Sequence, residues 1–358
     1  MNEKRGLLLQ SLMIGRQNNF DFIRFFAASL VVFSHSYMLS LGHGQTEPLM
    51  VLTNDQTTLG HLAVMVFFIT SGFLITQSFD KSRDPFLFLK ARILRIFPAL
   101  ILVALLSVFL LGPLVTTLSI DSYFTSKATY DYLGVVLFFP MKYFLPGVFE
   151  QNVYEGVVNG SLWTLGYEFI CYIIVLLFGI LGFLKKRFFL LTMFFITYLL
   201  SFLTLPVGNQ FFELYSSFAI GGIIYLFRDK FPINDGLAII SVISILLSMF
   251  TSYFVEIFTI FGGYIILYLA YTPRIQLHQF GKYGDFSYGI YIFSFPIQQM
   301  IIYIMGGQMN HYLNFILAYP LVLIFAFISW HLVEKNSLKL KNINKHRIPN
   351  YDRKRELF

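Results

Sequence analysis

The chain has 358 residues, of which 56% are hydrophobic and only 13% are charged, and its mean hydropathy is +0.68. A soluble domain carries about 25% charged residues, so this composition excludes an ordinary soluble globular protein. The formal net charge is +7, which suggests nucleic-acid binding only where the basic residues gather in one patch. Here they lie between long apolar segments. These segments are unbroken and do not alternate with polar residues, which favours membrane helices over a membrane β-barrel.

Ten segments approach the roughly 20 apolar residues that a helix needs to cross a bilayer. The sequence therefore predicts an all-α polytopic membrane protein with about ten transmembrane helices. The predicted spans, in chain order, are 20–41, 60–79, 87–111, 162–184, 188–206, 210–227, 236–254, 256–272, 286–305 and 312–333.

The distribution of lysine and arginine predicts the orientation of these spans. If the N-terminus lies in the cytoplasm, the inner connections hold nearly all basic residues, and the outer connections hold only Lys127 and Lys142. Cytoplasmic connections are enriched in lysine and arginine, so both termini are predicted to be cytoplasmic. The net charge of +7 is thus a signal of topology, and no nucleic-acid partner is expected.

The two ends of the chain are expected to lie outside the membrane domain, which is predicted to span 20–335. Residues 1–19 form a predicted cytoplasmic segment, in which 6–14 would lie along the inner membrane surface. Residues 336–358 form a predicted basic cytoplasmic tail that anionic lipids would attract. Cys171 is the only cysteine, so no intrachain disulfide and no cysteine-based metal site are expected.

The first span contains three polar side chains, Asp21, Arg24 and His35. It is too long for the core of a signal peptide and is predicted to be an uncleaved helix. Spacings of three and eleven residues place all three side chains on one helical face. A charge in the centre of a bilayer costs about 2.5–3.5 kcal/mol, so such residues usually face the protein interior and have a function. The alternative is an ion pair and a histidine that only help helices to pack.

The longest connection, 112–160, falls on the predicted outer side. Within it, 132–141 is apolar but too short to cross a membrane, so a re-entrant or surface-lying segment is predicted. One interpretation is that this connection covers a site that opens outward. The alternative, which this segment alone favours, is an ordinary structured loop.

Polar residues in the second and third spans leave two interpretations open. Thr70, Ser71 and Gly72 interrupt an apolar run, and such small residues serve either close helix packing or a passage for substrate. Arg92 and Arg95 lie one turn apart at the predicted inner mouth. Two guanidinium groups so placed suit a phosphate-rich ligand, although inner arginines are also what topology requires.

The fourth span begins with Trp163, Tyr167 and Glu168. Glu168 lies about 9 Å below the predicted outer end of its helix, and His35 lies at about the same depth in the first span. If the two helices are neighbours, the carboxylate would orient and polarise the imidazole as a general base. Trp163 is also typical of an interfacial aromatic residue.

Six short motifs occur in a fixed order along the chain. They are FDFIR followed by His35, FFITSGFLIT, RILRIFP, SLWTLGYE, FSYGIYIF and HLVEK. Together they resemble the acyltransferase-3 family of membrane acyltransferases, and the resemblance covers about residues 19–335.

This resemblance implies an integral membrane enzyme of the bacterial inner membrane. It would take an acyl group, often acetyl, from cytoplasmic acyl-CoA and transfer it to a hydroxyl of a cell-surface polysaccharide or a lipid-linked glycan precursor. The expected partners are therefore acyl-CoA as co-substrate, a glycan acceptor and membrane lipid, with no bound cofactor and no metal. The oligomeric state is not indicated by the sequence.

The resemblance and the polar pattern together predict the site residues. His35 would take the proton from the acceptor hydroxyl, and a covalent acyl-enzyme is the competing chemistry. The predicted catalytic residues are His35, Arg24, Asp21 and Glu168, the predicted acyl-CoA-binding residues are Arg92, Arg95 and Ser71, and the predicted acceptor-binding residues are Trp163 and Tyr167.

One position departs from the family pattern. Many members carry a histidine where this chain has Ser294, so no role of that histidine is transferred. The competing class of protein is a transporter of glycans or small molecules, but the two halves of the chain show no repeat of hydropathy. A structural subunit without chemistry is disfavoured by the cost of the polar face in the first span.

Overall fold

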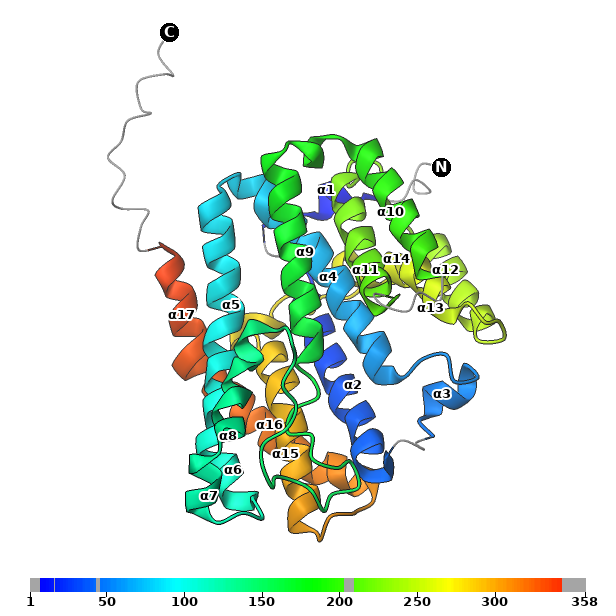
Figure 1. Cartoon of the computed structure of the whole chain (residues 1–358). Helices are drawn as coiled ribbons and strands as arrows, with labels where there is room; N and C mark the ends of the chain where they lie inside the picture. The colour runs from blue at the N-terminus through cyan, green and yellow to red at the C-terminus, as the bar shows by residue number, and fades with distance from the viewer. Residues whose placement is uncertain (1–6, 16, 43–45, 203–208, 343–358) are drawn as a thin grey trace, which may run out of the picture.

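The computed structural model describes residues 7–15, 17–42, 46–202 and 209–342, and these residues are mostly helical. Figure 1 shows the helices as one elongated bundle with a smaller group of helices at one side. The long helices are α2 (Phe20–Leu41), α4 (Leu59–Ser82), α5 (Pro85–Leu106), α9 (Trp163–Ile180), α10 (Arg187–Ser201), α11 (Asn209–Leu226), α12 (Asp235–Ser248), α14 (Gly263–Tyr271), α15 (Ser287–Ile304) and α16 (His311–Ser329).

Three continuous helices consist of two α-helical parts joined by a π-helical turn. The continuous helices are α5 with η2 (Ser107–Leu111) and α6 (Gly112–Val115), α13 (Phe254–Ile257) with η5 (Phe258–Gly262) and α14, and α16 with η7 (Trp330–Glu334) and α17 (Lys335–Lys339). Residues 335–342, predicted to begin a solvated tail, are therefore helical, and α17 packs against α5. Residues 343–358 lie outside the described residues.

Every predicted span overlaps a helix, although residues 203–206 of the predicted span 188–206 lie outside the described residues. Fewer helices meet the length and hydropathy that crossing a bilayer requires. Among the described residues, six continuous helices are long and apolar enough to cross a membrane. They are 20–41, 59–82, 85–115, 163–180, 254–271 and 311–339. Helices α10 and α12 are apolar but shorter, so the count of ten crossings and the cytoplasmic termini stay predictions.

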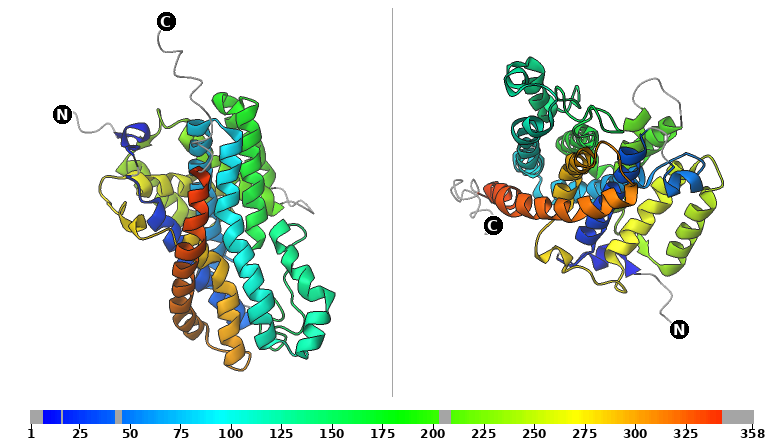
Figure 2. Two further views of the ribbon diagram at one scale, coloured as in Figure 1. Left: turned by 90° about the vertical axis from the view of Figure 1, so that its left-hand side faces the viewer. Right: turned by 90° about the horizontal axis from the view of Figure 1, so that it is seen from below.

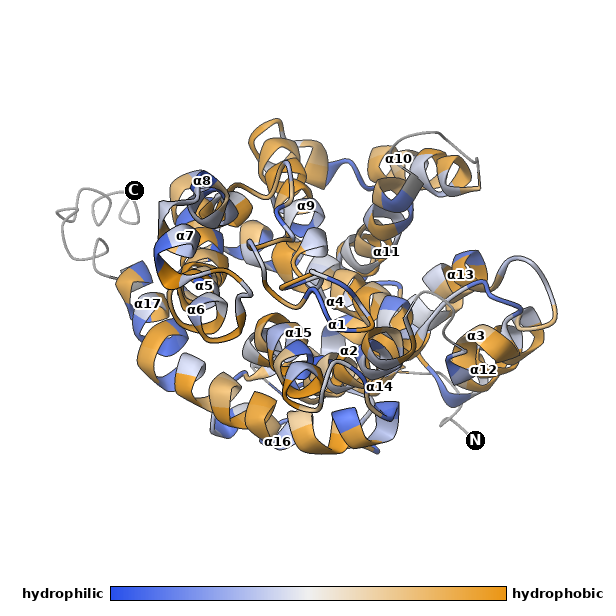
Figure 3. Cartoon of the chain, turned by 60° about the horizontal axis from the view of Figure 1, so that its bottom comes forward, coloured by the Kyte–Doolittle hydropathy of each residue, from blue (hydrophilic) through white to orange (hydrophobic). Residues whose placement is uncertain are grey.

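The outer faces of the helices are apolar, as the lipid-facing surface of a membrane protein must be. On α16 and η7, Ile316 and Leu332 are 62% and 68% exposed. Figure 3 shows the same hydrophobic colouring on the outward sides of α5, α12 and α16. An exposed apolar surface of this extent is typical of contact with lipid.

Helix α4 lies at the centre and packs against α2, α9 and α11, while α15 packs against α2 and α16. Figure 2 shows this arrangement from two further directions. Two glycines bring α4 and α11 into contact. A Cβ atom at Gly72 would lie 1.8 Å from the carbonyl oxygen of Phe218, and one at Gly221 would lie 2.0 Å from that of Ile69. The packing interpretation of Gly72 is therefore confirmed.

The apolar N-terminal segment is held against the helical bundle by strand pairing and by a buried side chain. Strand β1 (Leu7–Leu8) pairs antiparallel with β2 (Pro232–Ile233), and Leu9 at the start of α1 (Leu9–Leu12) is fully buried. This pairing ties the segment to the connection between α11 and α12. The predicted position along the membrane surface stays a prediction.

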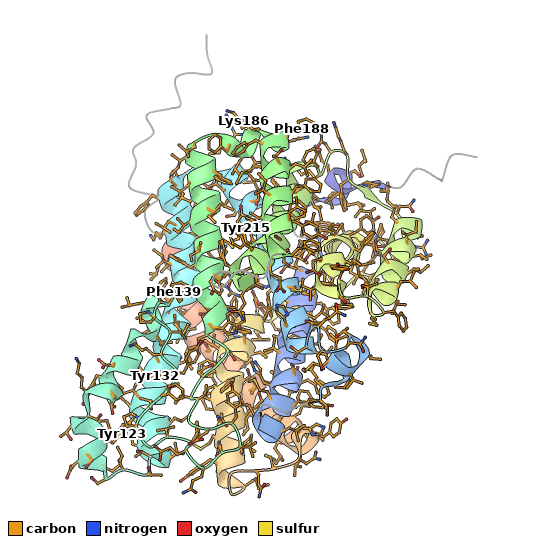
Figure 4. All side chains as sticks on the ribbon, turned by 45° about the vertical axis from the view of Figure 1, so that its right-hand side comes forward. Tyr123, Tyr132, Phe139, Lys186, Phe188 and Tyr215 are labelled. Atoms are coloured by element: carbon orange, nitrogen blue, oxygen red, sulfur yellow. The ribbon has the colours of Figure 1, made fainter. Side chains whose placement is uncertain are left out.

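The segment between α6 and α9 folds into a structured cap. It contains α7 (Ile120–Thr125), α8 (Lys127–Asp131) and a 3₁₀-helix, η3 (Tyr132–Leu137). Tyr132 and Phe138 are buried, and the Phe138 ring lies 5.5 Å from that of Phe97 on α5. The structured-loop interpretation is thus favoured. Figure 4 shows Tyr123 and Tyr132 of this cap at the opposite end of the molecule from Lys186 and Phe188.

Candidate active site

Helices α2, α4, α9 and α15 enclose a small polar cavity in the core. Its volume is about 30 Å³, which is enough for one or two water molecules. The polar lining side chains are Arg24, Thr164, Glu168, Ser287, Tyr288 and Tyr291, and apolar residues of α4 and α9 complete the wall. The structure therefore brings together Arg24 and Glu168, two of the predicted catalytic residues.

Glu168 is held in this cavity by two hydroxyl groups. Ser71 Oγ on α4 donates a hydrogen bond of 3.0 Å to Glu168 Oε1, and the Tyr172 hydroxyl, one turn further along α9, donates to the same oxygen. Ser71, which was predicted to contact acyl-CoA, thus contacts the carboxylate of Glu168. These bonds fix the direction of the carboxylate towards α4.

His35 lies further along α2, at the end nearer the cap. Its ring stands edge-on to that of Phe295 on α15, with 5.3 Å between the ring centres. The Nδ1 atom is buried and makes no hydrogen bond within the described part of the chain. Leaving a buried polar group unpaired costs about 1–3 kcal/mol, so this nitrogen is a candidate to meet a substrate.

The predicted equal depth of His35 and Glu168 is not found. Arg24 shares a cavity with Glu168, whereas His35 lies eleven residues beyond Arg24, or about 16 Å along the helix axis. The reason is the cap. Phe139 packs against Tyr167 with 5.8 Å between the ring centres, so α9 begins beneath the cap and not at the end of the bundle that His35 approaches.

The two arginines at the start of α5 have different surroundings. The Arg95 guanidinium forms an ion pair with Asp285, just before α15, and a second one of 3.3 Å with Glu334 at the end of η7. Glu334 is 1% exposed and also accepts a hydrogen bond of 3.0 Å from Ser329 Oγ. Arg95 therefore joins three separate parts of the chain.

Asp285 lies in the connection before α15 and is held in its ionised form. Burial opposes ionisation, but the positive charges of Arg95 and Arg24 and the hydrogen bonds from Ser287 together outweigh it and lower the pKa of the Asp285 carboxyl from 3.8 to about 2. The Ser287 hydroxyl also donates a hydrogen bond to this carboxylate. Sequence reasoning missed Asp285 and Glu334 as partners of Arg95, although Glu334 lies within the HLVEK motif and Asp285 directly precedes the FSYGIYIF motif.

Arg92 faces the other way, towards α9. Its guanidinium carbon lies 5.8 Å from the ring centre of Phe88 and 5.9 Å from that of Tyr172, the residue that donates to Glu168. No acidic partner appears among the ion pairs of the described residues for Arg92, and its buried Nε atom makes no hydrogen bond there. The Nε atom of Arg24 is in the same condition.

The remaining predicted residues lie at the edges of this arrangement. Asp21 is exposed and lies against the turn at Gly281, since a Cβ atom there would lie 1.9 Å from Asp21 Oδ2. Trp163 and Tyr167 contact edge to face, 5.8 Å apart, at the end of α9 under the cap. Ser294 is buried on α15, and its hydroxyl donates to the Tyr291 carbonyl oxygen over 3.2 Å.

Comparison with known proteins supports the resemblance seen in the motifs. The pattern of the acyltransferase-3 family, described as an acyltransferase domain, matches residues 17–333. The O-acetyl transferase of Shigella phage Sf6 is 30% identical over 348 residues, which is 90% of this chain and 96% of that protein. Nodulation protein 10 of Rhizobium leguminosarum bv. viciae is 36% identical over 166 residues, which is 44% of this chain and 43% of that protein. No solved structure matches the chain.

The family pattern covers nearly the whole described bundle, including the cavity around Glu168 and both arginines of α5. The resemblance inferred from the six motifs is thereby confirmed. The chain belongs to the acyltransferase-3 family and is a membrane acyltransferase.

Proposed function

We propose that the protein transfers an acetyl group from cytoplasmic acetyl-CoA to a hydroxyl of a cell-surface polysaccharide, or of its lipid-linked precursor, in the bacterial inner membrane. The full-length relative from phage Sf6 is named an O-acetyl transferase, which supports acetyl as the acyl group and oxygen as the acceptor atom. The observation that carries the proposal is a series of three buried polar atoms without partners among the described residues: Arg92 Nε, Arg24 Nε and His35 Nδ1.

The donor end of this series is Arg92. A guanidinium group offers several donors in one plane and binds phosphate in a bidentate manner. Arg92 forms no ion pair with a carboxylate in the described part of the chain, so its donors are open to the phosphates of CoA. Arg95 would act on the donor indirectly, because its ion pairs with Asp285 and Glu334 hold the wall of the inner mouth.

The middle of the series is the cavity between Arg24 and Glu168. At about 30 Å³ it is too small for the pantetheine arm, so acetyl-CoA must separate α2, α4, α9 and α15 slightly to enter. Arg24 offers hydrogen-bond donors to the amides of that arm. Ser71 and Tyr172 would keep the Glu168 carboxylate directed away from the path of the thioester.

The chemical step takes place at His35. The acceptor hydroxyl oxygen forms the new ester bond with the acetyl carbonyl carbon, and its proton passes to the free imidazole nitrogen. The carbon–sulfur bond of the thioester breaks, and CoA leaves as a thiolate that takes up a proton. We favour direct transfer over a cysteine-linked intermediate, because Cys171 is fully buried and does not line the cavity.

The test uses the purified full chain in nanodiscs with acetyl-CoA and a panel of oligosaccharides. Free CoA is measured with a thiol reagent, and acetylated sugar is measured by mass spectrometry. We expect CoA release that depends on the sugar and equals the acetylated product formed. Absence of both products with every sugar in the panel, in a protein that binds acetyl-CoA, would contradict the proposed function.

A further inference from the structure

A second cavity opens in the cap, at the end of the molecule away from Arg92. Its volume is about 920 Å³, and every residue that lines it belongs to the range 126–157. Sites for small molecules measure roughly 300–1,000 Å³, so this cavity is large enough for one or two sugar units. We propose that it binds the acceptor as an uncharged sugar and presents it towards His35. This inference rests on the proposed function.

The side chains in the cavity suit an uncharged sugar. Phe144 is 61% exposed and offers an apolar ring to the carbon–hydrogen face of a pyranose. Glu150 and Glu155 are exposed and offer carboxylate oxygens, which accept hydrogen bonds from sugar hydroxyls. All lining residues are described, and none is lysine or arginine. A uronic or sialic acid would therefore meet like charge without a compensating cation.

One wall of the cavity is fixed by a buried amide. Gln299 on α15 is fully buried, and its Nε2 donates to the carbonyl oxygens of Tyr154 and Val157 over 2.8 and 2.9 Å. The Asn152 amide in turn donates to the Gln299 side-chain and backbone oxygens over 2.8 and 2.9 Å. A wall held in this way does not need to be ordered when a ligand binds, which favours affinity.

The same helix connects this wall to the proposed base. Phe295 lies one turn before Gln299 on α15, and its ring centre is 6.2 Å from that of Tyr154 and 5.3 Å from that of His35. A single ring thus lies between the wall of the cavity and the imidazole. Figure 1 shows the extended chain of the cap running alongside α15, in agreement with these contacts. A sugar in the cavity would therefore bring a hydroxyl to His35 when the Tyr154 and Phe295 rings shift aside.

The cap also contacts the end of α2, which fixes the position of the cavity relative to the helix that carries His35. A Cβ atom at Gly42, at the end of α2, would lie 3.2 Å from Val153, which lines the cavity. The backbone N–H of Val153 also donates to the Gly307 carbonyl oxygen over 2.9 Å. The helix that carries His35 and the helix that carries Phe295 therefore meet the same stretch of the cap.

The experiment measures binding of the full chain, in fluorescent nanodiscs, to an array of immobilised oligosaccharides. The array holds uncharged hexose, amino-sugar, and uronic- or sialic-acid-containing glycans. The test variant is Phe144→Ala with Glu155→Gln. The matched control is Phe109→Ala with Asp121→Asn. Phe109 is 50% exposed on η2, Asp121 is exposed on α7, and neither lines the cavity.

We expect the wild type and the control to bind uncharged glycans, and the test variant to bind them at least tenfold more weakly while it retains acetyl-CoA binding. Preference for acidic glycans, equal binding by the test variant, or no binding by the wild type would each overturn the inference. Failure of the proposed function has a different signature, which is bound glycan and bound acetyl-CoA without acetylated product. Loss of acetyl-CoA binding together with glycan binding would show general damage, and Tyr154→Leu then replaces the test variant with the same expected loss.

Discussion

Arg92 and Arg95 lie three residues apart on α5, yet the regions around them have opposite character. Around Arg95, two carboxylates from distant parts of the chain neutralise the guanidinium. Around Arg92, aromatic rings cover the guanidinium, and its buried Nε atom has no hydrogen-bond partner among the described residues. The motifs predicted one role for both arginines, whereas their surroundings separate an ion-pair cluster around Arg95 from the region around Arg92, which we propose binds the donor.

The difference has an energetic meaning. A buried charge that has both its ion pairs and its hydrogen bonds is stable as it is, and removing one partner leaves the other uncompensated. A buried donor without a partner costs free energy in the empty protein and regains it when a ligand binds. We therefore expect substitutions of Arg95 and its partners to lower stability more than activity. We expect substitutions of Arg92, Arg24 and His35 to lower activity more than stability.

The largest effect is expected for His35. Replacement by glutamine keeps a polar side chain of similar size but removes the base, so acetyl transfer should fall by about 10²–10⁴-fold. CoA release and sugar acetylation are the measurements, and the amount of folded protein in detergent is the control. Wild-type turnover by His35→Gln would exclude the proposed base.

The next effect is expected for Glu334, on stability. Glu334→Ala leaves the Arg95 guanidinium with Asp285 alone, and breaking a buried ion pair costs about 3–5 kcal/mol. Thermal unfolding of the purified protein in one detergent should show a clear decrease in the midpoint. An unchanged midpoint would mean that water already solvates the ion pairs of Arg95. The proposed difference between the regions around Arg95 and Arg92 would then be wrong.

A smaller and more specific effect is expected for Arg92. Arg92→Lys keeps the charge that supports topology but loses the bidentate geometry, so binding of acetyl-CoA should weaken by about 1.5–3 kcal/mol. Arg95→Lys is the matched variant, and we expect it to lower the unfolding midpoint more than Arg92→Lys does. A titration with acetyl-CoA and a thermal scan on both variants separate the roles. If Arg95→Lys weakened acetyl-CoA binding more, and Arg92→Lys lowered the unfolding midpoint more, the phosphate site would lie at Arg95.

The Asp285 carboxylate gives the ion-pair cluster a dependence on pH. Burial alone would raise its pKa, but Arg95, Arg24 and the hydrogen bonds from Ser287 together stabilise the ionised form, so the pKa falls from 3.8 to about 2 in the folded protein. An acid with a lowered pKa contributes stability that is complete above its unfolded pKa and is lost as the pH falls through the folded value. The contribution, about 2 kcal/mol at roughly 1.4 kcal/mol per pKa unit, should therefore disappear between about pH 4 and pH 2.

Asp285→Asn is the variant that tests this dependence. At pH 6 it should unfold at a lower temperature than the wild type, and the difference should shrink as the pH falls from 4 to 2. A difference that stays constant over this range would show that Asp285 acts through packing and not through its charge.

The sequence predicted the positions of the helices well, but it did not predict which side chains from distant segments contact one another. Long apolar runs define helices on their own, so each of the ten predicted ranges overlaps a helix within the described residues. The partners of Arg95 lie 190 and 239 residues away, and no local pattern reveals such a pairing. The depth of Glu168 was misjudged because the cap covers the start of α9, so a count from the helix end did not measure depth.

The smallest effect is expected for the exposed ion pair of Arg187 and Asp229, which extends the comparison from buried to solvated charges. The Arg187 guanidinium donates to both carboxylate oxygens of Asp229, over 2.7 and 2.9 Å, and this contact lowers the pKa of the Asp229 carboxyl. Both side chains are more than a third exposed, so water and salt compete with the pair. Asp229→Asn should leave the unfolding midpoint and the CoA release unchanged within error, at low and at high salt. A decrease as large as that of Glu334→Ala would mean that burial does not decide which ion pairs stabilise this protein, because the two pairs share their chemistry and differ mainly in exposure.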